Sequence, residues 1–519
     1  MTITTKETIL PTVAKFLATL HESELVYCHW KSNDCLHEAL MGSGDLDILF
    51  DNKDIDTIRK VAEANGFIEF TTAPCQSYPF IHDFIAIDPS QGRIIHIHAH
   101  FQLTIGEARV KSYIAPWASH VLNNRVFDQV LGVYHAHPCD EAIMLIVRAA
   151  LKTQALPLTI FWRRKLNKNE LSQASRELNY LLAQTSLPEI LERAPIFLGE
   201  SSVTALQEVC LNGLSVSLLN SFLNDVHVEA HKWRRHGPWK QLIKIYLHDA
   251  IHFMLRINRK LELFDIPMRR TLPKEGIVVA IVGVDGTGKS SQARDVTKEL
   301  RKKIDVAHVY MGTGKGQANL IRKPLIIFRN WIGQKQRGTL FPIGKMPANQ
   351  NNKPNNQRNF ARRIWIIIWA ASVLIERWQK IKRVVTAKKR GFVVVCDRYP
   401  QNTVAGYNDG PLLNDPGACK KKCSLLSRLE SNFYKTLEVS YPPDLVIRLY
   451  AEPDIIKSRR PEMTVSEIRK KQNDIMSVDF HSSTLNICSD NSFPQVNRTV
   501  VAAIWKYIQS KNKKCKPYD

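Results

Sequence analysis

One Gly-rich segment of this chain has the residue types and spacing of a phosphate-binding loop. Residues 283–290 read GVDGTGKS and fit the pattern G-x-x-x-x-G-K-[ST]. In such loops backbone N–H groups surround the phosphates, the lysine reaches the β- and γ-phosphates, and the hydroxyl after it binds Mg²⁺. The segment therefore predicts a site for ATP and Mg²⁺, with Lys289 on the phosphates and Ser290 on the metal ion.

The residues on both sides of the loop provide the surroundings that the motif needs. Residues 276–282 are an apolar, β-branched run, which is typical of a buried strand. Residues 291–300 are polar and contain no Gly or Pro, which favours a helix whose positive end faces the phosphates. The alternative, a chance Gly-rich turn, requires neither element. The predicted nucleotide-binding residues are Gly283, Asp285, Gly286, Gly288, Lys289, Ser290 and Ser291.

Strands and helices alternate through residues 273–519, which predicts an α/β fold with a doubly wound parallel sheet. Apolar runs predict four strands after the first. They cover residues 307–311, 392–396, 444–450 and 484–488. Ligands of such sheets bind outside the carboxyl ends of the strands. Gly283, Gly312 and Asp397 occupy such ends, and we expect them near one site.

Asp397-Arg398-Tyr399 directly follows one of these apolar strands. A carboxylate there can hold the water shell of Mg²⁺, and an arginine can bind a phosphate through two hydrogen bonds. The alternative is an aspartate that caps a helix beside a solvated arginine. Next to a phosphate-binding loop, the metal and phosphate roles are favoured.

Over about residues 275–515 the chain resembles the thymidylate kinase family. The loop GVDGTGKSSQ, Asp397-Arg398-Tyr399, and Pro443 to Val446 followed by Glu452-Pro453 carry the resemblance. It implies transfer of the ATP γ-phosphoryl group to a nucleoside monophosphate or a related small metabolite.

The resemblance also implies roles for individual residues. Asp285 would lie near the sugar of the acceptor, and Arg398 would bind the acceptor phosphate. A mobile lid would supply Arg459 and Arg460 to the transferring phosphoryl group. The implied catalytic residues are Lys289, Asp397, Arg398, Arg459 and Arg460. Such an arrangement suits phosphoryl transfer, which needs positioning and positive charge more than covalent chemistry.

Two segments depart from the family pattern. Gly312 to Gly316 replaces the Arg-Glu-Pro-Gly-Gly run of the acceptor loop, and Ala405 to Asn408 replaces the Ala-Tyr-Gln stretch. The resemblance therefore supports the phosphoryl-transfer chemistry of the family more strongly than its preference for a particular acceptor base. The acceptor need not be dTMP or a nucleotide.

The first block, residues 1–115, contains a second set of candidate ligands. Asp45 and Asp47 alternate at the start of an apolar strand, so both carboxylates face one side and can share a divalent metal ion. Upstream, His29 to Asn33 opens a helix-like stretch. Together these residues resemble the nucleotidyltransferase superfamily over about residues 20–105. The resemblance implies phosphate contacts for Lys31 and Ser32 and a two-metal role for Asp45 and Asp47.

Histidines occupy a later strand of this block. His96 stands where that superfamily has a third carboxylate, and His96, His98 and His100 alternate along one face. This pattern fits either a transition-metal site or imidazoles that hydrogen-bond on a half-buried strand. Asp83 or Asp88 could supply the missing negative charge.

Between these two blocks, residues 116–272 read as almost wholly helical. Met144, Leu145, Val147 and Leu151 recur at helical spacing and predict the core of a bundle that covers the first block. The predicted domains are therefore a small α+β nucleotidyltransferase-like domain at 1–115, a helical domain at 116–272 and a P-loop kinase-like domain at 273–519.

The 519-residue chain carries 72 Lys and Arg against 49 Asp and Glu, a net charge of +23 that favours anionic partners. Eleven of these basic residues, and no acidic one, lie between Asp305 and Glu376. The basic insertion 315–363 could shape the acceptor site, bind a membrane surface or polyanion, or be a solvated loop. The apolar run 364–375 predicts a buried helix of the kinase core or a membrane-surface helix.

The ten cysteines are scattered, and no second pair joins Cys419 and Cys423 to provide the four ligands of a structural zinc site. Residues 1–21 lack the apolar core of a signal peptide. A cytoplasmic, reduced protein is the simplest interpretation, and the oligomeric state stays open.

Three hypotheses follow from the sequence. The first is an ATP-dependent, Mg²⁺-requiring phosphotransferase that acts on a phosphate-accepting small molecule. The second is a nucleotidyltransferase that modifies a sugar, protein or RNA through the first block. The third is a nucleotide-gated protein that binds a polyanion or a membrane through its basic insertion.

Overall fold

A computed structural model describes residues 9–107, 110–153, 168–261, 264–312, 356–404, 409–413 and 424–514. The chain forms two compact units. Unit 1 comprises residues 1–273 with 515–519, and unit 2 comprises residues 274–514. The three-domain division of the chain stays a prediction.

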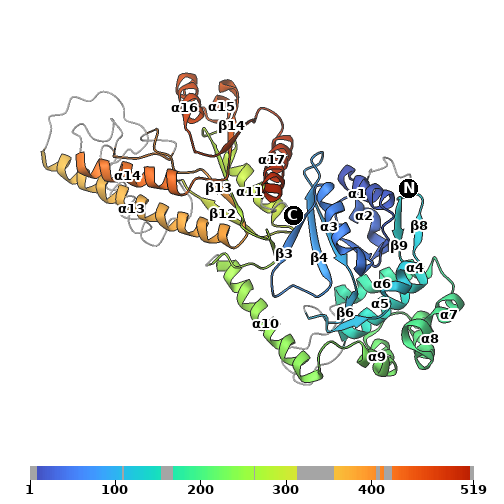
Figure 1. The fold of residues 1–519 in the computed structure, drawn as a ribbon. Helices are drawn as coiled ribbons and strands as arrows, with labels where there is room; N and C mark the ends of the chain where they lie inside the picture. The colour runs from blue at the N-terminus through green and yellow to red at the C-terminus, as the bar shows by residue number, and fades with distance from the viewer. Residues whose placement is uncertain are drawn as a thin grey trace. The chain divides into compact units, whose positions relative to one another are not determined.

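An eight-stranded mixed sheet forms the centre of unit 1, in the order β10-β3-β4-β5-β2-β1-β9-β8 (Figure 1). Its strands are β1 (Tyr27–His29), β2 (Leu46–Phe50), β3 (Ile68–Thr72), β4 (Ile81–Ile87), β5 (Ile94–His100), β8 (Val126–Asp128), β9 (Val133–His135) and β10 (Arg270–Thr271). A separate two-stranded sheet pairs β6 (Leu103–Ile105) with β7 (Tyr113–Ala115). β5 lies between β2, which is parallel to it, and β4, which is antiparallel.

Helices of two groups accompany this sheet. The first group is α1 (Pro11–Glu22), η1 (Asn33–Cys35), α2 (Leu36–Leu40), η2 (Asn52–Asp54), α3 (Ile55–Ala64) and α4 (Ala118–Asn123). The second group is α5 (Pro138–Thr153), α6 (Lys168–Leu182), α7 (Leu187–Leu198), η3 (Glu200–Ser202), α8 (Val203–Asn212), α9 (Val216–Lys232) and α10 (Pro238–Leu261). In the second group, α5 packs against α6, α7 and α9.

Helix α5 confirms the predicted core of the middle region. Met144, Leu145, Val147 and Leu151 are at most 3% exposed. They belong to one apolar cluster that also contains Trp30 from the segment after β1. The helices of the middle region therefore share their core with the sheet of the first block, as expected.

The structure differs from the predicted helical character of residues 116–272 at three places. Strands β8 and β9 extend the sheet beside β1, and β10 pairs with β3 at the other edge. These strands have two or three residues, which is too short for an alternating pattern to be recognised.

In the first block, the helix-like stretch was expected to open at His29. His29 instead ends strand β1, and helical turns begin only at Asn33.

Unit 2 contains a five-stranded parallel sheet in the order β12-β13-β11-β14-β15. The strands are β11 (Ile277–Gly283), β12 (Val306–Tyr310), β13 (Val393–Asp397), β14 (Leu445–Tyr450) and β15 (Ser483–Cys488), and each matches a predicted strand. The helices are α11 (Lys289–Leu300), α13 (Asn356–Lys389), α14 (Ser424–Ser440), α15 (Pro453–Arg459), α16 (Val465–Ser477) and α17 (Phe493–Lys514).

β11 is buried along its whole length because helices cover both faces of this sheet. Its residues Val278, Ala280 and Val282 share an apolar cluster with residues of α13, α14, α15 and α16. Helices α11 and α17 pack against each other and against the sheet, and belong to the opposite side (Figure 1). The expected α/β fold with a parallel sheet is confirmed.

The apolar run 364–375 lies within α13 and has two different faces where its side chains are described. Trp369 and Val373 are buried, whereas Ile368 and Ile375 are 44% and 47% exposed. Within the described ranges, no helix combines the length and apolar character needed to cross a bilayer. Residues 313–355, most of the basic insertion, lie outside the described residues, as do Cys419 and Cys423.

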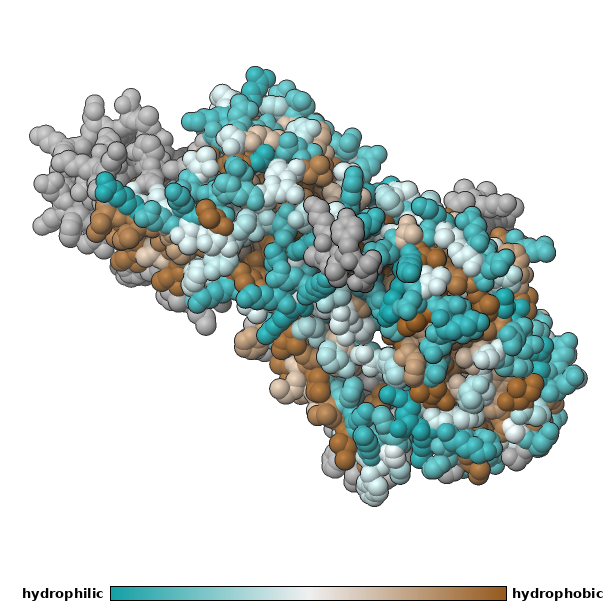
Figure 2. Space-filling model, in the orientation of Figure 1, coloured by the Kyte–Doolittle hydropathy of each residue, from teal (hydrophilic) through white to brown (hydrophobic). Residues whose placement is uncertain are grey.

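An apolar stripe marks the surface of α10 in unit 1. Trp239, Ile243, Leu247 and Met254 recur at helical spacing and are each more than half exposed. Figure 2 shows this stripe as brown surface over the helix. Apolar side chains that gather in this way exceed the scattered exposure of a typical monomer surface.

Asp444 fixes the position of β11 in unit 2, and we expect its removal to destabilise this unit. Its carboxylate accepts a hydrogen bond from the backbone N–H of Val278 at 2.8 Å and pairs with Lys388 at 2.9 Å and Lys511 at 3.3 Å. Asp444→Ala leaves two lysines and one N–H without this acceptor. It should lower the free energy of unfolding by about 3 kcal/mol in chemical denaturation.

Asp454→Ala is the matched control, because Asp454 is exposed in the first turn of α15. This substitution should lower the free energy of unfolding by less than about 1 kcal/mol. Equal losses for the two variants would contradict the structural role of Asp444.

Candidate functional site

The Gly-rich loop connects β11 to α11 as the motif predicts. β11 ends at Gly283, and α11 begins at Lys289 after Gly288, which has a φ of 84°. A Cβ atom on Gly283 would lie 2.5 Å from the carbonyl oxygen of Leu449, so no larger residue fits there. Ser290 and Ser291 follow Lys289 in the first turn of α11. The N–H groups of this turn are those that can bind an anion.

Lys289 is 4% exposed, and its Nζ lies 2.6 Å from Oδ1 of Asp285. Burial lowers the pKa of Lys289, and the neighbouring Arg398 lowers it further. Burial alone would raise the pKa of Asp285, but the charges of Lys289 and Arg398 lower it below its ordinary value. The carboxylate of Asp285 therefore balances the ammonium group of Lys289 at close range.

Arg398 links this loop to a second carboxylate. Its Nη2 lies 2.7 Å from Oδ1 of Asp285, and its Nη1 lies 3.4 Å from Oδ2 of Asp409. Asp409 also pairs with Arg377 of α13 at 3.5 Å. The backbone of Arg398 has a φ of 73°, an uncommon conformation that is often found at functional sites. Neither Asp409 nor Arg377 belongs to a spaced motif, so neither could be assigned to this site from the sequence.

Asp397 has an unusual environment at the end of β13. It is 3% exposed, and its Oδ1 has no hydrogen-bond partner among the residues that the structure describes. It pairs in register with Ile281, two residues before Gly283. A buried carboxylate oxygen without a donor is costly, and a hydrated cation would satisfy it. Together with the hydroxyl of Ser290, which lies in the first turn of α11, this donor set fits Mg²⁺.

Arg459 and Arg460 lie at the end of α15, next to the loop. Arg459 donates from Nη1 to the carbonyl oxygen of Gly286 at 3.2 Å. A Cβ atom on Gly286 would lie 3.2 Å from Cγ of Arg460, and that arginine also pairs with Glu462 at 3.6 Å. The structure thus gathers the predicted residues of the kinase-like part around one loop. Their chemical roles stay predictions.

The segments that depart from the family pattern are described only at Gly312. Gly312 lies against Arg398, since a Cβ atom there would be 2.8 Å from its Cδ. Residues 313–355 and 405–408, which contain both departures from the family pattern, lie outside the described residues.

A row of carboxylates and histidines crosses three strands of unit 1. Asp47 on β2 and Asp83 on β4 both stand opposite His98 on β5. His96 Nε2 lies 2.8 Å from Oδ1 of Asp83, and its Nδ1 lies 2.8 Å from Oδ1 of Asp45. Of the two acids that could supply charge here, Asp83 is the one in contact.

Asp88 is occupied elsewhere. It accepts hydrogen bonds from the backbone N–H and the hydroxyl of Thr12, at 3.1 and 2.9 Å, and from the N–H of Ser90 at 3.0 Å. Asp88 therefore stabilises the chain at the end of β4, away from the histidines.

Cations already balance the carboxylates of this row. Lys31 Nζ lies 2.9 Å from Oδ1 of Asp47, and Arg270 Nε lies 3.0 Å from Oδ1 of Asp83. Burial opposes ionisation, but Lys31 and His100 hold the pKa of Asp47 well below its ordinary value. Arg270 comes from β10, 187 positions after Asp83, and nothing in the sequence linked the two.

The turn after β1 uses its backbone N–H groups internally. Ser32, which has a φ of 59°, donates from its N–H to Glu177 at 3.1 Å, and Asn33 donates to Glu141 at 3.0 Å. These donors would otherwise be available to a phosphate. The phosphate contacts of Lys31 and Ser32, and the two-metal role of Asp45 and Asp47, stay predictions.

Comparison with known proteins gives an ATP-binding relationship. No protein-family model matches the chain. The uncharacterized ATP-binding protein YghR of Escherichia coli strain K12 is 26% identical over 195 residues, which is 37% of this chain and 73% of that protein. The uncharacterized ATP-binding protein YghS of the same strain is 26% identical over 197 residues, 37% of this chain and 77% of that protein. The YghR protein of E. coli O6:H1 matches equally well, at 26% over 195 residues.

Glu141 makes the stability of unit 1 depend on pH. Burial, with a smaller contribution from the nearby Glu177, raises its pKa to about 8, although hydrogen bonds from Asn33 oppose both. The folded chain then holds a proton that the unfolded chain releases between pH 4.5 and about 8. The free energy of unfolding should therefore fall as the pH rises through this window. The full difference between the two pKa values corresponds to a loss on the order of 4 kcal/mol.

Glu141→Gln, which does not titrate, should flatten the dependence of the unfolding free energy on pH between 5 and 9. The control Glu192→Gln changes an exposed residue of α7 and should leave the slope as in the wild type. A slope that Glu141→Gln does not alter would show that this carboxyl is ionised in the folded chain.

Proposed function

We propose that unit 2 is an ATP-dependent, Mg²⁺-requiring phosphotransferase of the thymidylate kinase-like class. The observation that carries the proposal is the buried Lys289 in the first turn of α11, after a Gly-rich loop at the carboxyl end of a parallel strand. The ATP-binding names of the relatives support it. The acceptor would be a nucleoside monophosphate or a related small metabolite.

Binding of ATP would exchange the partners of Lys289. In this structure the ammonium group pairs with Asp285, and the β- and γ-phosphates would replace that carboxylate. Arg459, which already donates to the loop at Gly286, and the neighbouring Arg460 would add positive charge as the phosphoryl group transfers. Ser290 and Asp397 would hold Mg²⁺, which neutralises phosphate charge when bound.

The carboxylate released from Lys289 would then orient the acceptor. Asp285 stays next to Arg398, so one group can accept a hydrogen bond from a hydroxyl while the other binds an anion. The acceptor oxygen forms a bond to the γ-phosphorus as the bond to the bridging oxygen breaks, and ADP leaves. An anionic acceptor oxygen needs no general base.

Unit 1 offers a second candidate function, nucleotidyl transfer. The close approach of Lys31 to Asp47 favours it, since the resemblance puts both residues in one phosphate and metal site. Against it, cations already balance the carboxylates, and Glu177 and Glu141 occupy the N–H groups of the turn. We therefore assign the main activity to unit 2.

One experiment separates the two functions. The purified chain is incubated with Mg²⁺ and ATP labelled in either the γ-phosphate or the adenine, together with nucleoside monophosphates or sugars. Transfer of the γ-label supports the kinase. Transfer of labelled AMP that survives Lys289→Ala but is lost in the double variant Asp45→Asn, Asp47→Asn would assign the activity to unit 1 instead.

Lys289→Ala should lower kcat for ATP turnover by at least about 100-fold, because it removes the buried cation next to the transferring group. The far-ultraviolet circular dichroism spectrum should be unchanged. Lys298→Ala, on the exposed side of the last turn of the same helix, should retain full turnover. Normal turnover in Lys289→Ala would reject the proposal.

Arg398→Ala should act mainly on the acceptor. We expect KM for the acceptor found in the panel to rise at least tenfold, with a smaller change in KM for ATP, because an ionic hydrogen bond to the acceptor is lost. Steady-state kinetics with each substrate varied in turn measures the two constants.

Arg469→Ala changes an exposed arginine of α16 and should leave both constants unchanged. A rise in KM for ATP alone would place Arg398 on the donor nucleotide rather than on the acceptor.

A further inference from the structure

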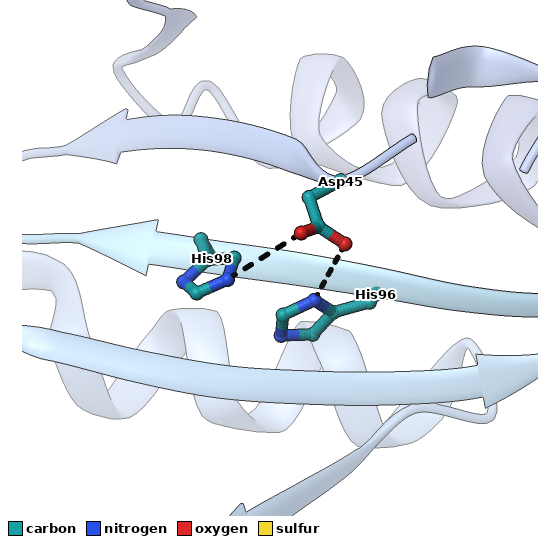
Figure 3. A group of neighbouring side chains, drawn as sticks. All are labelled: Asp45, His96 and His98. Carbon is teal, nitrogen blue, oxygen red and sulfur yellow. Dashed lines mark hydrogen bonds and ion pairs between the residues drawn. The ribbon is translucent and has the colours of Figure 1, made fainter. Parts of the chain in front are cut away.

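Three side chains of unit 1 converge from two neighbouring segments. Figure 3 shows Asp45, directly before β2, with its two carboxylate oxygens directed toward His96 and His98 of β5. His96 Nδ1 lies 2.8 Å from one oxygen, and His98 Nε2 lies 3.8 Å from the other. One ligand atom from each residue falls within 4.8 Å of the others.

Asp83 determines which ring nitrogens carry protons. Its Oδ1 lies 2.8 Å from Nε2 of His96 and 3.4 Å from Nδ1 of His98. A carboxylate only accepts hydrogen bonds, so these two nitrogens are the ones that carry hydrogen. The other nitrogens, His96 Nδ1 and His98 Nε2, are then lone-pair acceptors that face Asp45.

This arrangement places acceptors against acceptors. A neutral imidazole has one N–H, and His96 uses it on Asp83. Its Nδ1 nevertheless lies 2.8 Å from an oxygen of Asp45, a hydrogen-bond distance that two acceptors reach only with a proton between them. That proton is the one that a metal ion bound to both atoms would replace.

We propose that Asp45, His96 and His98 bind a divalent transition-metal ion of the Zn²⁺ type. Two imidazole nitrogens and one carboxylate oxygen suit such an ion better than Mg²⁺, which prefers oxygen ligands. Asp83 stands behind both rings as the carboxylate that orients metal-binding histidines in many zinc sites.

The second histidine group on this strand is less suited to the ion. It combines Asp47, His98 and His100. Asp47 already has Lys31 at 2.9 Å and His100 Nε2 at 3.2 Å on the same oxygen. A metal ion there would have to displace an ammonium group from Asp47.

A pocket of about 190 Å³ reaches the site. His98, Asp83 and Arg270 line it. Arg270 Nη2 lies 3.2 Å from His98 Nε2, so this guanidinium group covers the ligand nitrogen and must move aside when the ion binds. Three protein ligands leave a fourth position for water or a small molecule, as in catalytic rather than structural zinc sites.

The test measures metal binding by the full chain after removal of metal with a chelator. Zn²⁺ titration by calorimetry should find a site that Asp45→Asn and His98→Gln each weaken at least tenfold, and that excess Mg²⁺ does not compete for. His82→Gln is the matched control, since His82 lies on the neighbouring strand and pairs with Glu69. The control should bind as the wild type does.

Cysteine sites are excluded by Co²⁺ substitution. The Co²⁺ spectrum of the chain should lack the thiolate charge-transfer band and should lose its d–d bands in Asp45→Asn. Circular dichroism and thermal unfolding confirm that each variant is folded.

Two outcomes would overturn the proposal. Zn²⁺ binding that Asp45→Asn and His98→Gln leave unchanged, or no binding at all, would mean that His96 holds an extra proton instead. Binding lost in Asp47→Asn but kept in Asp45→Asn would place the ion at the other histidine group. Lys289→Ala should bind Zn²⁺ normally, so this test is independent of the kinase proposal.

Discussion

The parallel pairing of β11 with β13 is the constraint on which the candidate kinase site depends. It aligns Ile281 with Asp397, so the Gly-rich loop and the buried carboxylate leave the sheet at the same edge. β14, on the other side of β11, approaches so closely that only glycine fits at position 283. The first turn of α11 and the end of α15 then complete the surroundings of Lys289.

Both candidate sites hold their charges in compensated pairs. In unit 2, Asp285 balances Lys289 and Arg398, and in unit 1, Asp47 and Asp83 balance Lys31 and Arg270. Such pairs make the burial of charge tolerable without a ligand, and a ligand must exchange with one partner. For an anion such as a nucleotide phosphate, the partner that leaves is a carboxylate. For a metal ion, it is a cation such as Arg270.

The two sites differ in how many of their residues can be predicted from short stretches of sequence. The Gly-rich loop is one continuous segment, and its glycines, lysine and serine lie in order between a strand and a helix. The parallel strands were likewise recognised because each is a continuous apolar run. Asp83 could be named only as one of two acids, and the short strands β8, β9 and β10 have no recognisable pattern.

The sequence by itself determined the α/β character of the second half, its five strands and the residues of the Gly-rich loop, because these depend on local spacing and hydrophobic period. Only the tertiary structure decided that Arg377 and Asp409 support Arg398, and that Asp83 rather than Asp88 reaches His96. It also brought Arg270 next to His98. Those contacts join residues far apart in the chain, and they depend on strand order and register, which no short stretch of sequence encodes.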